Sequence, residues 1–164
     1  PPRQQPITVV VVRHAEKAAE PGSDPPLSEA GKARAQALAD TLAAAHVDAL
    51  FATQFRRTQD TLGPLAESRE LTINIRPVER DVEASARELA REIRALPADA
   101  LAGVAGHSHT APAILAALGV ENPPTLTEAD YDGLFIVRYR EGSKSPDFIH
   151  ARYGAPDTAP LPAP

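Results

Sequence analysis

Titratable side chains directly follow two apolar segments of this sequence. The first segment, residues 7–12, runs into Arg13 and His14 after six residues without a charge. The second, residues 100–105, leads through a glycine to His107. An imidazole is suited to attack phosphorus near neutral pH, because it is partly unprotonated there and needs no separate base. The sequence therefore predicts chemistry on a phosphoryl group, with His14 as the nucleophile.

Cationic side chains near this nucleophile indicate how the charge of a phosphoryl group would be balanced. A phosphoryl group in transfer carries negative charge on its equatorial oxygens, so fixed cationic donors around it stabilise the transition state. Arg13 adjoins His14, and Arg57 follows the next predicted strand. We therefore expect Arg13, Arg57 and His107 to form a cage around the phosphoryl oxygens.

The elements that position these residues are predicted from hydrophobic periodicity. Residues 7–12 are β-branched and apolar toward both faces, which is typical of a central strand in a covered parallel sheet. Ser28 is expected to cap the first helix, and Pro64 to kink or divide the second. The pattern then predicts helix 29–46, strand 48–52, helix 55–68, strand 71–76, helix 83–96, strand 100–105, a helix from Thr110, and strands 133–140 and 147–153 as an edge hairpin.

This alternation of strands and helices is typical of βαβ units. The predicted fold class is α/β, a three-layer α/β/α sandwich with a mostly parallel central sheet. In such sheets ligands bind beyond the carboxyl ends of the strands, where loops and helix N-termini meet. If the strands before His14 and His107 are parallel and near the centre, both side chains enter the same crevice.

Composition narrows the class of protein. The 164 residues are 43% hydrophobic and 24% charged, which fits one globular domain over residues 1–164. The proline-rich ends, 1–6 and 155–164, are expected to be loose tails. A net charge of −5 gives no cationic field for nucleic acid, and no apolar run approaches the roughly 20 residues of a membrane span. Because the chain has no cysteine, disulfides, thiolate metal sites and a cysteine nucleophile are excluded.

Four blocks of the sequence carry a resemblance to a known family. They are Val12-Arg13-His14-Ala15-Glu16-Lys17, Pro26-Leu27-Ser28-Glu29-Ala30-Gly31, Ala52-Thr53-Gln54-Phe55-Arg56-Arg57-Thr58-Gln59-Asp60-Thr61, and Gly106-His107-Ser108. They resemble, in order, the Arg-His pair, the Leu-Ser/Thr-x-x-Gly helix start, the Ser-x-x-x-Arg-x-x-Gln-Thr segment and the second histidine of the histidine phosphatase (phosphoglycerate mutase-like) superfamily. The blocks cover residues 7–118 and look most like its short bacterial phosphatases.

This resemblance implies a reaction and a set of roles. His14 would become a transient phosphohistidine, Arg13, Arg57 and His107 would bind the phosphoryl oxygens with Ser108 beside them, and water would release phosphate. The implied enzyme is a phosphoric monoester hydrolase of the histidine acid phosphatase type that needs no metal or other cofactor. Mutases of the superfamily usually carry longer insertions over the substrate, so this short chain favours a phosphatase. Its Pro- and Gln-rich start looks like that of an exported member after leader removal, which favours a location outside the cytoplasm over a cytoplasmic one.

The acid that protonates the leaving group has no motif of its own here. Many members of the superfamily place a glutamate after the third strand, where this sequence has Glu79, Asp81 and Glu83, and Asp81 is the preferred candidate. The chain also departs from the common pattern at two glycines, which are replaced by Ala15 after the first histidine and by Ser108 after the second.

Substrate choice is expected to lie in three loops, residues 18–26, 78–84 and 119–132. None contains a recognition motif, so sugar phosphates, phosphohistidine proteins and lipopolysaccharide heptose phosphate all stay open by resemblance. The expected partner is a phosphorylated small molecule or a phosphoprotein, and the protein is expected to be a monomer.

Two other functions stay open. His107 and His109 have the His-x-His spacing of many zinc sites, and with His14 and a carboxylate they would make a metal-dependent hydrolase. A non-catalytic domain that binds a phosphorylated ligand would keep the same cage without turnover. Apart from the metal alternative, His109 is expected to be exposed or to cap a helix.

Overall fold

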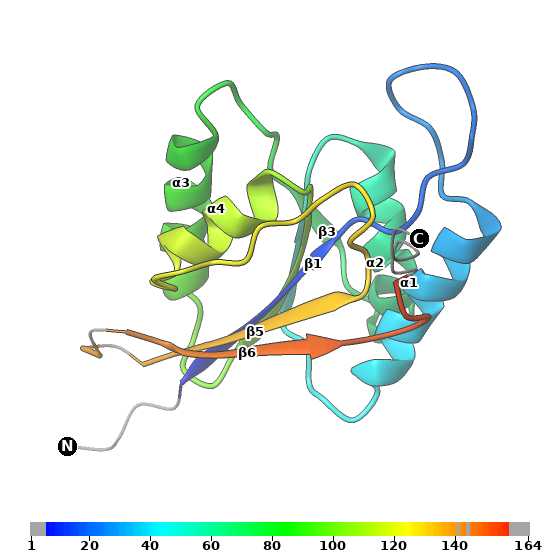
Figure 1. Ribbon diagram of the computed structural model, residues 1–164. Coiled ribbons are helices and arrows are strands. Elements are labelled where there is room, and N and C mark those ends of the chain that lie inside the picture. Colours follow the sequence, from blue (N-terminus) through cyan, green and yellow to red (C-terminus); the bar gives the residue numbers. More distant parts are fainter. Residues whose placement is uncertain (1–5, 141, 144, 158–164) are drawn as a thin grey trace, which may run out of the picture.

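The computed structural model describes residues 6–140, 142–143 and 145–157 (Figure 1). Within them, strands and helices alternate in the predicted order, so the α/β class is confirmed. The elements are β1 (Ile7–Arg13), α1 (Glu29–Thr41), β2 (Ala49–Ala52), α2 (Arg56–Arg69), β3 (Ile73–Ile75), α3 (Val82–Arg94), β4 (Leu101–Gly106), α4 (Thr110–Ala117), β5 (Gly133–Tyr139) and β6 (Asp147–Arg152).

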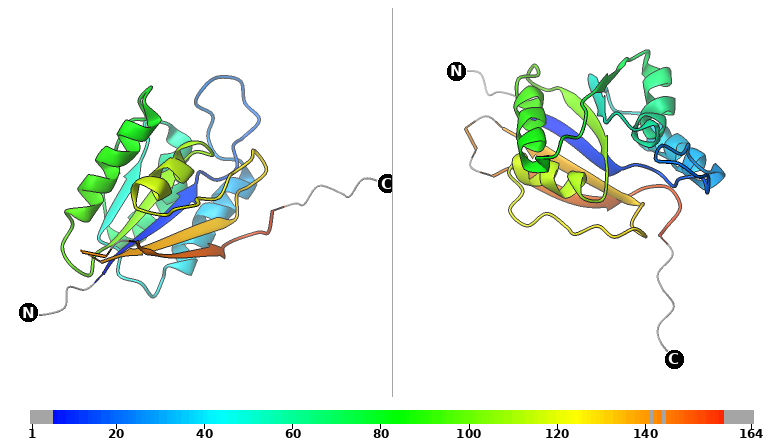
Figure 2. Two further views of the ribbon diagram at one scale, coloured as in Figure 1. Left: turned by 60° about the vertical axis from the view of Figure 1, so that its left-hand side comes forward. Right: turned by 90° about the horizontal axis from the view of Figure 1, so that it is seen from above.

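The strands form one mixed sheet in the order β3-β2-β4-β1-β5-β6. β1 is parallel to β4, and β2 is parallel to both β3 and β4. β5 is antiparallel to β1 and to β6, which makes the predicted hairpin at the sheet edge. Figures 1 and 2 show α1 and α2 on one side of the sheet and α3 and α4 on the other, which gives the predicted three layers.

β1 is buried on both faces, as its run of β-branched residues predicts. Val9 and Val11 belong to the core under α3 and α4, whereas Val10 and Val12 belong to the core under α1 and α2. Burial of each valine side chain contributes about 1.5–3 kcal/mol. The strand is therefore firmly anchored just before the two titratable residues that follow it.

The first helix is shorter than predicted, ending at Thr41 and not at His46. Arg69 of α2 donates to the carbonyl oxygens of Leu42 and Ala45, so acceptors just past the helix end are satisfied by a side chain from another element. This contact lets the chain turn toward β2 in a segment whose alanines would otherwise continue the helix.

Pro64 does not divide α2, which runs unbroken from Arg56 to Arg69. A proline removes a single hydrogen bond to the carbonyl four residues earlier, and that residue, Asp60, is exposed to water. Within the described residues, no helix combines the length and the apolar character that a membrane crossing needs.

The predicted C-terminal tail is partly ordered against the rest of the chain. The carbonyl oxygen of Ala155 accepts a hydrogen bond from Arg34 at 2.8 Å, and Oδ1 of Asp157 accepts from the N–H groups of Tyr131 and Asp132. Residues 155–157 are thus held in place and are not loose, and Pro6 at the other end is buried. The remaining residues of both predicted tails, 1–5 and 158–164, lie outside the described residues.

Candidate active site

The carboxyl ends of β1 and β4 bring two histidines together. The strands are parallel neighbours in which Arg13 pairs with Gly106, and the His14 N–H donates to the Gly106 carbonyl at 2.8 Å. The His14 and His107 rings lie 5.4 Å apart between centroids, in an edge-to-face arrangement. Both residues are almost fully buried, 3% and 5% exposed. The parallel strands thus bring the two rings next to each other, as the prediction requires.

Hydrogen bonding fixes which nitrogen of His14 carries the hydrogen. Nδ1 lies 2.8 Å from the carbonyl oxygen of Ala15, which can only accept, so Nδ1 is the donor and Nε2 keeps its lone pair. The pKa of His14 is lowered from 6.5 to about 4, mainly by burial and further by the cationic side chains around it. At neutral pH the ring is therefore uncharged, with an unprotonated Nε2, which is the form that a nucleophile needs.

The block around Gly31 packs α1 against the residues that follow His14. The hydroxyl of Ser28 accepts a hydrogen bond from the Gly31 N–H at 3.1 Å, so the predicted helix cap is confirmed. A Cβ on residue 31 would lie 2.2 Å from the carbonyl oxygen of Glu16, a separation that only glycine avoids. This motif therefore supports the site through the backbone and supplies no reactive group.

Arg13 is buried and organises the loop before β5. Its Nη1 donates to the carbonyl oxygens of Thr127, Glu128 and Asp130 at 3.1–3.2 Å. Its Nη2 lies 3.3 Å from the carboxylate of Glu128. Its Nε is buried and has no hydrogen-bond partner among the described residues. One side of the guanidinium thus holds the loop, while Nε is left for another acceptor.

Arg57 lies in the first turn of α2, and its Nε is likewise buried without a partner in the described part of the chain. Its Nη1 donates to the carbonyl oxygen of Ser23 at 3.3 Å, and its guanidinium lies 4.5 Å above the ring of Phe55. The charges of Arg13 and Arg57 both contribute to lowering the pKa of His14 and of His107. The three residues of the predicted cage therefore lie close to one another and to His14.

His107 is oriented by a chain of hydroxyl groups. Thr58 Oγ1 lies 2.8 Å from the carbonyl oxygen of Phe55 and donates to it. Thr53 Oγ1, 2.9 Å from Thr58 Oγ1, then donates to Thr58 and accepts from Nε2 of His107 at 3.0 Å. In this arrangement Nε2 carries the ring hydrogen and Nδ1 does not. The pKa of His107 is lowered from 6.5 to about 3, mainly by burial.

Tyr131 is a site residue that the sequence analysis did not identify. The guanidinium of Arg13 lies 4.2 Å above its ring, and the ring is 6.3 Å from that of His14, edge to face. The available signal was that Tyr131 is the only aromatic residue of the 119–132 loop. An aromatic face beneath a guanidinium restrains its position, so this loop contributes to the cage through Tyr131.

Asp81, the preferred proton donor, lies at the N-cap of α3. Its carboxylate accepts a hydrogen bond from the N–H of Ala84 at 3.0 Å, and the residue is exposed. Among the described residues, no hydrogen bond or ion pair joins Glu79, Asp81 or Glu83 to the two histidines or the two arginines. The carboxylate that does contact the cage belongs to Glu128. The role of Asp81 as proton donor stays a prediction.

Ser108 and His109 begin the turn into α4. Ser108 is half-buried next to His107, and its hydroxyl makes no hydrogen bond within the described residues. His109 occupies the N-cap position without a side-chain cap bond, is exposed, and has its ring 5.8 Å from that of His107. In the described part of the chain, no three histidine, aspartate or glutamate side chains are gathered as metal ligands. The metal alternative therefore has no complete ligand set there.

Known proteins resemble this chain in sequence and in fold. Residues 9–82 match the sequence model of the histidine phosphatase superfamily (branch 1), whereas no curated protein sequence matches. The protein histidine phosphatase SixA, solved with tungstate, is 20% identical with a TM-score of 0.70 over 87% of this chain and 94% of its own. The mycobacterial glucosyl-3-phosphoglycerate phosphatase Rv2419c is 18% identical with a TM-score of 0.67 over 90% and 98%. YhfR of Bacillus stearothermophilus is 17% identical with a TM-score of 0.68 over 89% and 96%.

At these identities the structural likeness concerns the fold. The segment that matches in sequence is more specific, because it carries Arg13, His14 and Arg57. By this match, residues 9–82 are similar to the histidine phosphatase superfamily (branch 1).

Proposed function

We propose that this protein is a phosphatase that hydrolyses phosphate monoesters through a phosphohistidine on His14, without a metal ion. The observation that carries the proposal is a pair of buried Nε–H donors, on Arg13 and Arg57, which have no partner among the described residues. A buried donor without a partner costs about 1–3 kcal/mol, so it marks a place where an acceptor belongs. A tetrahedral oxyanion offers acceptors to both guanidinium groups at once.

Structures of the same fold support an oxyanion as the ligand. SixA was solved with tungstate, and Rv2419c with inorganic phosphate and with VO3. In the present chain we assign the phosphoryl oxygens to Arg13, Arg57 and His107, with Ser108 next to them. The two arginines supply the positive charge that a divalent cation supplies in metallophosphatases, which is why the proposal needs no metal.

The first step is the attack of His14 Nε2 on phosphorus. The P–N bond forms while the P–O bond to the alcohol breaks, and the departing oxygen takes a proton from an acid, for which Asp81 is the sequence-based candidate. The ring gains positive charge in this step. Its Nδ1–H donates to the Ala15 carbonyl at 2.8 Å, and this bond stabilises the charged ring.

The second step returns His14 to its starting form. Water attacks the phosphohistidine, its proton passes to the conjugate base of the leaving-group acid, and the P–N bond breaks to release phosphate. Arg13 and Arg57 neutralise the equatorial oxygens in both steps. His107 contributes a hydrogen bond once the bound dianion has raised its pKa, because a nearby negative charge favours the protonated imidazole.

The first experiment is hydrolysis of p-nitrophenyl phosphate with and without EDTA. We expect turnover that survives EDTA and falls by about a thousandfold or more in His14→Ala, because the nucleophile is lost. His109→Ala is the matched control, since that exposed imidazole lies outside the cage, and it should keep its activity. Rapid acid-free quenching with labelled substrate should trap a phosphohistidine in the wild type alone.

Retained turnover in His14→Ala would contradict the assignment of His14 as the nucleophile. Loss of turnover with EDTA would favour the metal-dependent hydrolase. Phosphate binding without turnover would favour a binding domain.

A further inference from the structure

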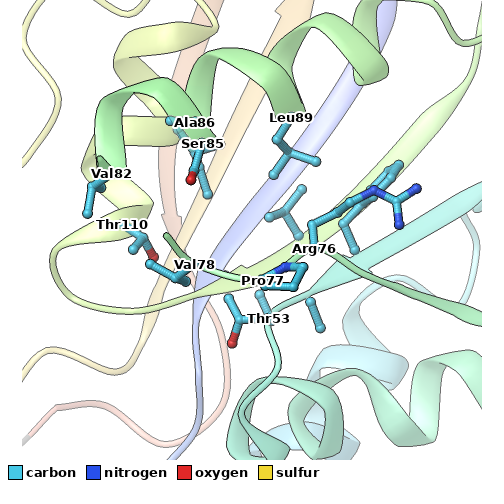
Figure 3. Close-up of a pocket in the computed structure, with 14 residues that line it drawn as sticks. Thr53, Arg76, Pro77, Val78, Val82, Ser85, Ala86, Leu89 and Thr110 are labelled. Carbon is cyan, nitrogen blue, oxygen red and sulfur yellow. The ribbon is translucent and has the colours of Figure 1, made fainter. Parts of the chain in front are cut away.

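An apolar pocket adjoins the histidine pair at the carboxyl ends of β2 and β4. It has a volume of about 50 Å³, is partly open to solvent, and lies between α3 and residues 76–78 (Figure 3). Thr53 and Thr110 line it, and both also contact His107. Thr53 Oγ1 lies 3.0 Å from Nε2 of His107, and Thr110 Oγ1 accepts a hydrogen bond from the backbone N–H of His107 at 2.7 Å. The pocket therefore shares a wall with the phosphoryl site.

Hydrocarbon groups form most of the remaining wall. Figure 3 shows Val82 and Leu89 of α3 directed toward Pro77 and Val78 across the space. Phe51, Val104 and Ile114 complete its floor and sides from β2, β4 and α4. Such a surface gains free energy when an apolar group displaces water from it.

The polar side chains on the wall are those of Thr53, Arg76, Ser85 and Thr110, and each has a hydrogen-bond partner within the protein; Ser85 Oγ accepts from the Glu79 N–H at 3.4 Å. Thr53 Oγ1 is hydrogen-bonded to Thr58 and His107, and Thr110 Oγ1 accepts from the His107 N–H. Arg76 forms a two-pronged ion pair with Glu92. A sugar or polyol would therefore bring hydroxyl groups into a place where few partners remain, and each unpaired hydroxyl weakens binding.

From this geometry we infer that the pocket receives the leaving group of the substrate, and that the physiological substrate is a phosphate monoester of an apolar or aromatic alcohol and not of a sugar. The inference rests on the proposed function, because it requires the phosphoryl group to lie at His14. Residues 79–81, which include the predicted proton donor, directly follow Val78 at the pocket edge.

The test uses phosphonates, which the protein cannot hydrolyse, so that binding is measured separately from turnover. Calorimetry compares methylphosphonate, propylphosphonate, 2,3-dihydroxypropylphosphonate and benzylphosphonate on the wild-type chain. We expect benzylphosphonate to bind at least tenfold more tightly than methylphosphonate, with a more negative heat-capacity change, which is the marker of apolar burial. Propylphosphonate should bind at least tenfold more tightly than its dihydroxy counterpart of the same carbon number.

Variants identify the pocket as the source of this preference. Ser85→Phe fills the pocket from α3, and Val82→Asn makes its rim polar at the first residue of that helix. Both variants should lower the ratio of benzyl- to methylphosphonate affinity toward one. Thr125→Phe is the matched control in a second, more open groove lined by Ser108, His109 and Pro123, and should keep the ratio. Circular dichroism verifies folding.

Each outcome distinguishes the two proposals. Equal wild-type affinity for methyl- and benzylphosphonate, or a ratio that Thr125→Phe removes and Ser85→Phe leaves unchanged, would overturn the apolar pocket and leave the phosphatase proposal standing. Failure of every phosphonate and of inorganic phosphate to bind would overturn both. Tighter binding of the dihydroxy compound than of propylphosphonate would point to a polyol substrate and contradict the inference.

Discussion

The two histidines of the site are held by different parts of the chain. The ring of His14 bonds the backbone carbonyl of the next residue, Ala15, whereas the ring of His107 bonds the side chain of Thr53, more than fifty residues away. The first arrangement depends on the path of the backbone at the end of β1. The second depends on which side chains stand on a neighbouring element. The two imidazoles should therefore respond to different kinds of substitution.

The largest effect is expected where backbone packing next to His14 is broken. In Gly31→Ala the new Cβ would lie 2.2 Å from the Glu16 carbonyl oxygen, so the chain after His14 must move, and the free energy of unfolding should fall by more than about 2 kcal/mol. Gly63→Ala is the matched control, because a Cβ there meets nothing within 4 Å in the interior of α2. That variant should be neutral or more stable by about 0.5–1 kcal/mol. Denaturant unfolding measures both, and similar losses in the two variants would show that the close approach at Gly31 has no special cost.

A smaller effect is expected when the side-chain support of His107 is removed. Thr53→Val leaves Nε2 of His107 without its acceptor, and kcat for p-nitrophenyl phosphate should fall about tenfold, the equivalent of roughly 1.4 kcal/mol. Thr53→Ser restores the hydroxyl and should recover most of the activity. The pH profile of kcat should also shift in Thr53→Val but not in Thr53→Ser. A purely structural role of Thr53 would not produce this difference in pH profile. Equal losses in the two variants would contradict the orienting role.

Acid should reveal both imidazoles through stability. Their pKa values in the folded protein, about 4 for His14 and about 3 for His107, lie below the ordinary 6.5, so the unfolded chain binds protons first as the pH falls. The free energy of unfolding should therefore decrease from about pH 6.5 down to about pH 3, with the contribution of His14 ending near pH 4 and that of His107 near pH 3. This decrease should be smaller in His14→Gln and smaller still in His107→Gln, because the pKa of His107 is the lower of the two. Unchanged pH dependence of denaturant unfolding in both variants would argue against two buried neutral rings.

The smallest effect is expected at the carboxylate that contacts the cage. Glu128 pairs with Arg13 at 3.3 Å but is 84% exposed, so its charge is largely screened by water. Glu128→Gln removes the charge that competes with a phosphate dianion, and inorganic phosphate should inhibit about two- to threefold more strongly at low salt. Glu121→Gln in the same loop should leave inhibition unchanged. Weaker inhibition in Glu128→Gln would instead assign the carboxylate a direct role in the reaction.

Local patterns were sufficient to predict most of the fold. The β-branched run at 7–12 marked the central strand, and Ser28 marked the start of α1. The end of α1 could not be predicted, because Arg69 of another helix satisfies the carbonyl groups there. That Pro64 does not divide α2 could not be predicted either, since the cost of one lost hydrogen bond depends on whether water reaches the freed carbonyl.

The features of the candidate site also fall into those that local sequence predicted and those that depend on tertiary contacts. Short-range sequence alone determined that an arginine and a histidine end the central strand, that a second histidine ends another, and that Arg57 begins a helix, because strand ends and helix starts are local properties. Only the tertiary structure decided that the two rings lie 5.4 Å apart, that Thr53 orients one of them, and that Tyr131 and Glu128 contact Arg13. Those contacts join residues from separate elements, and their geometry follows from the order of strands in the sheet and from the packing of helices against it, which no local pattern specifies.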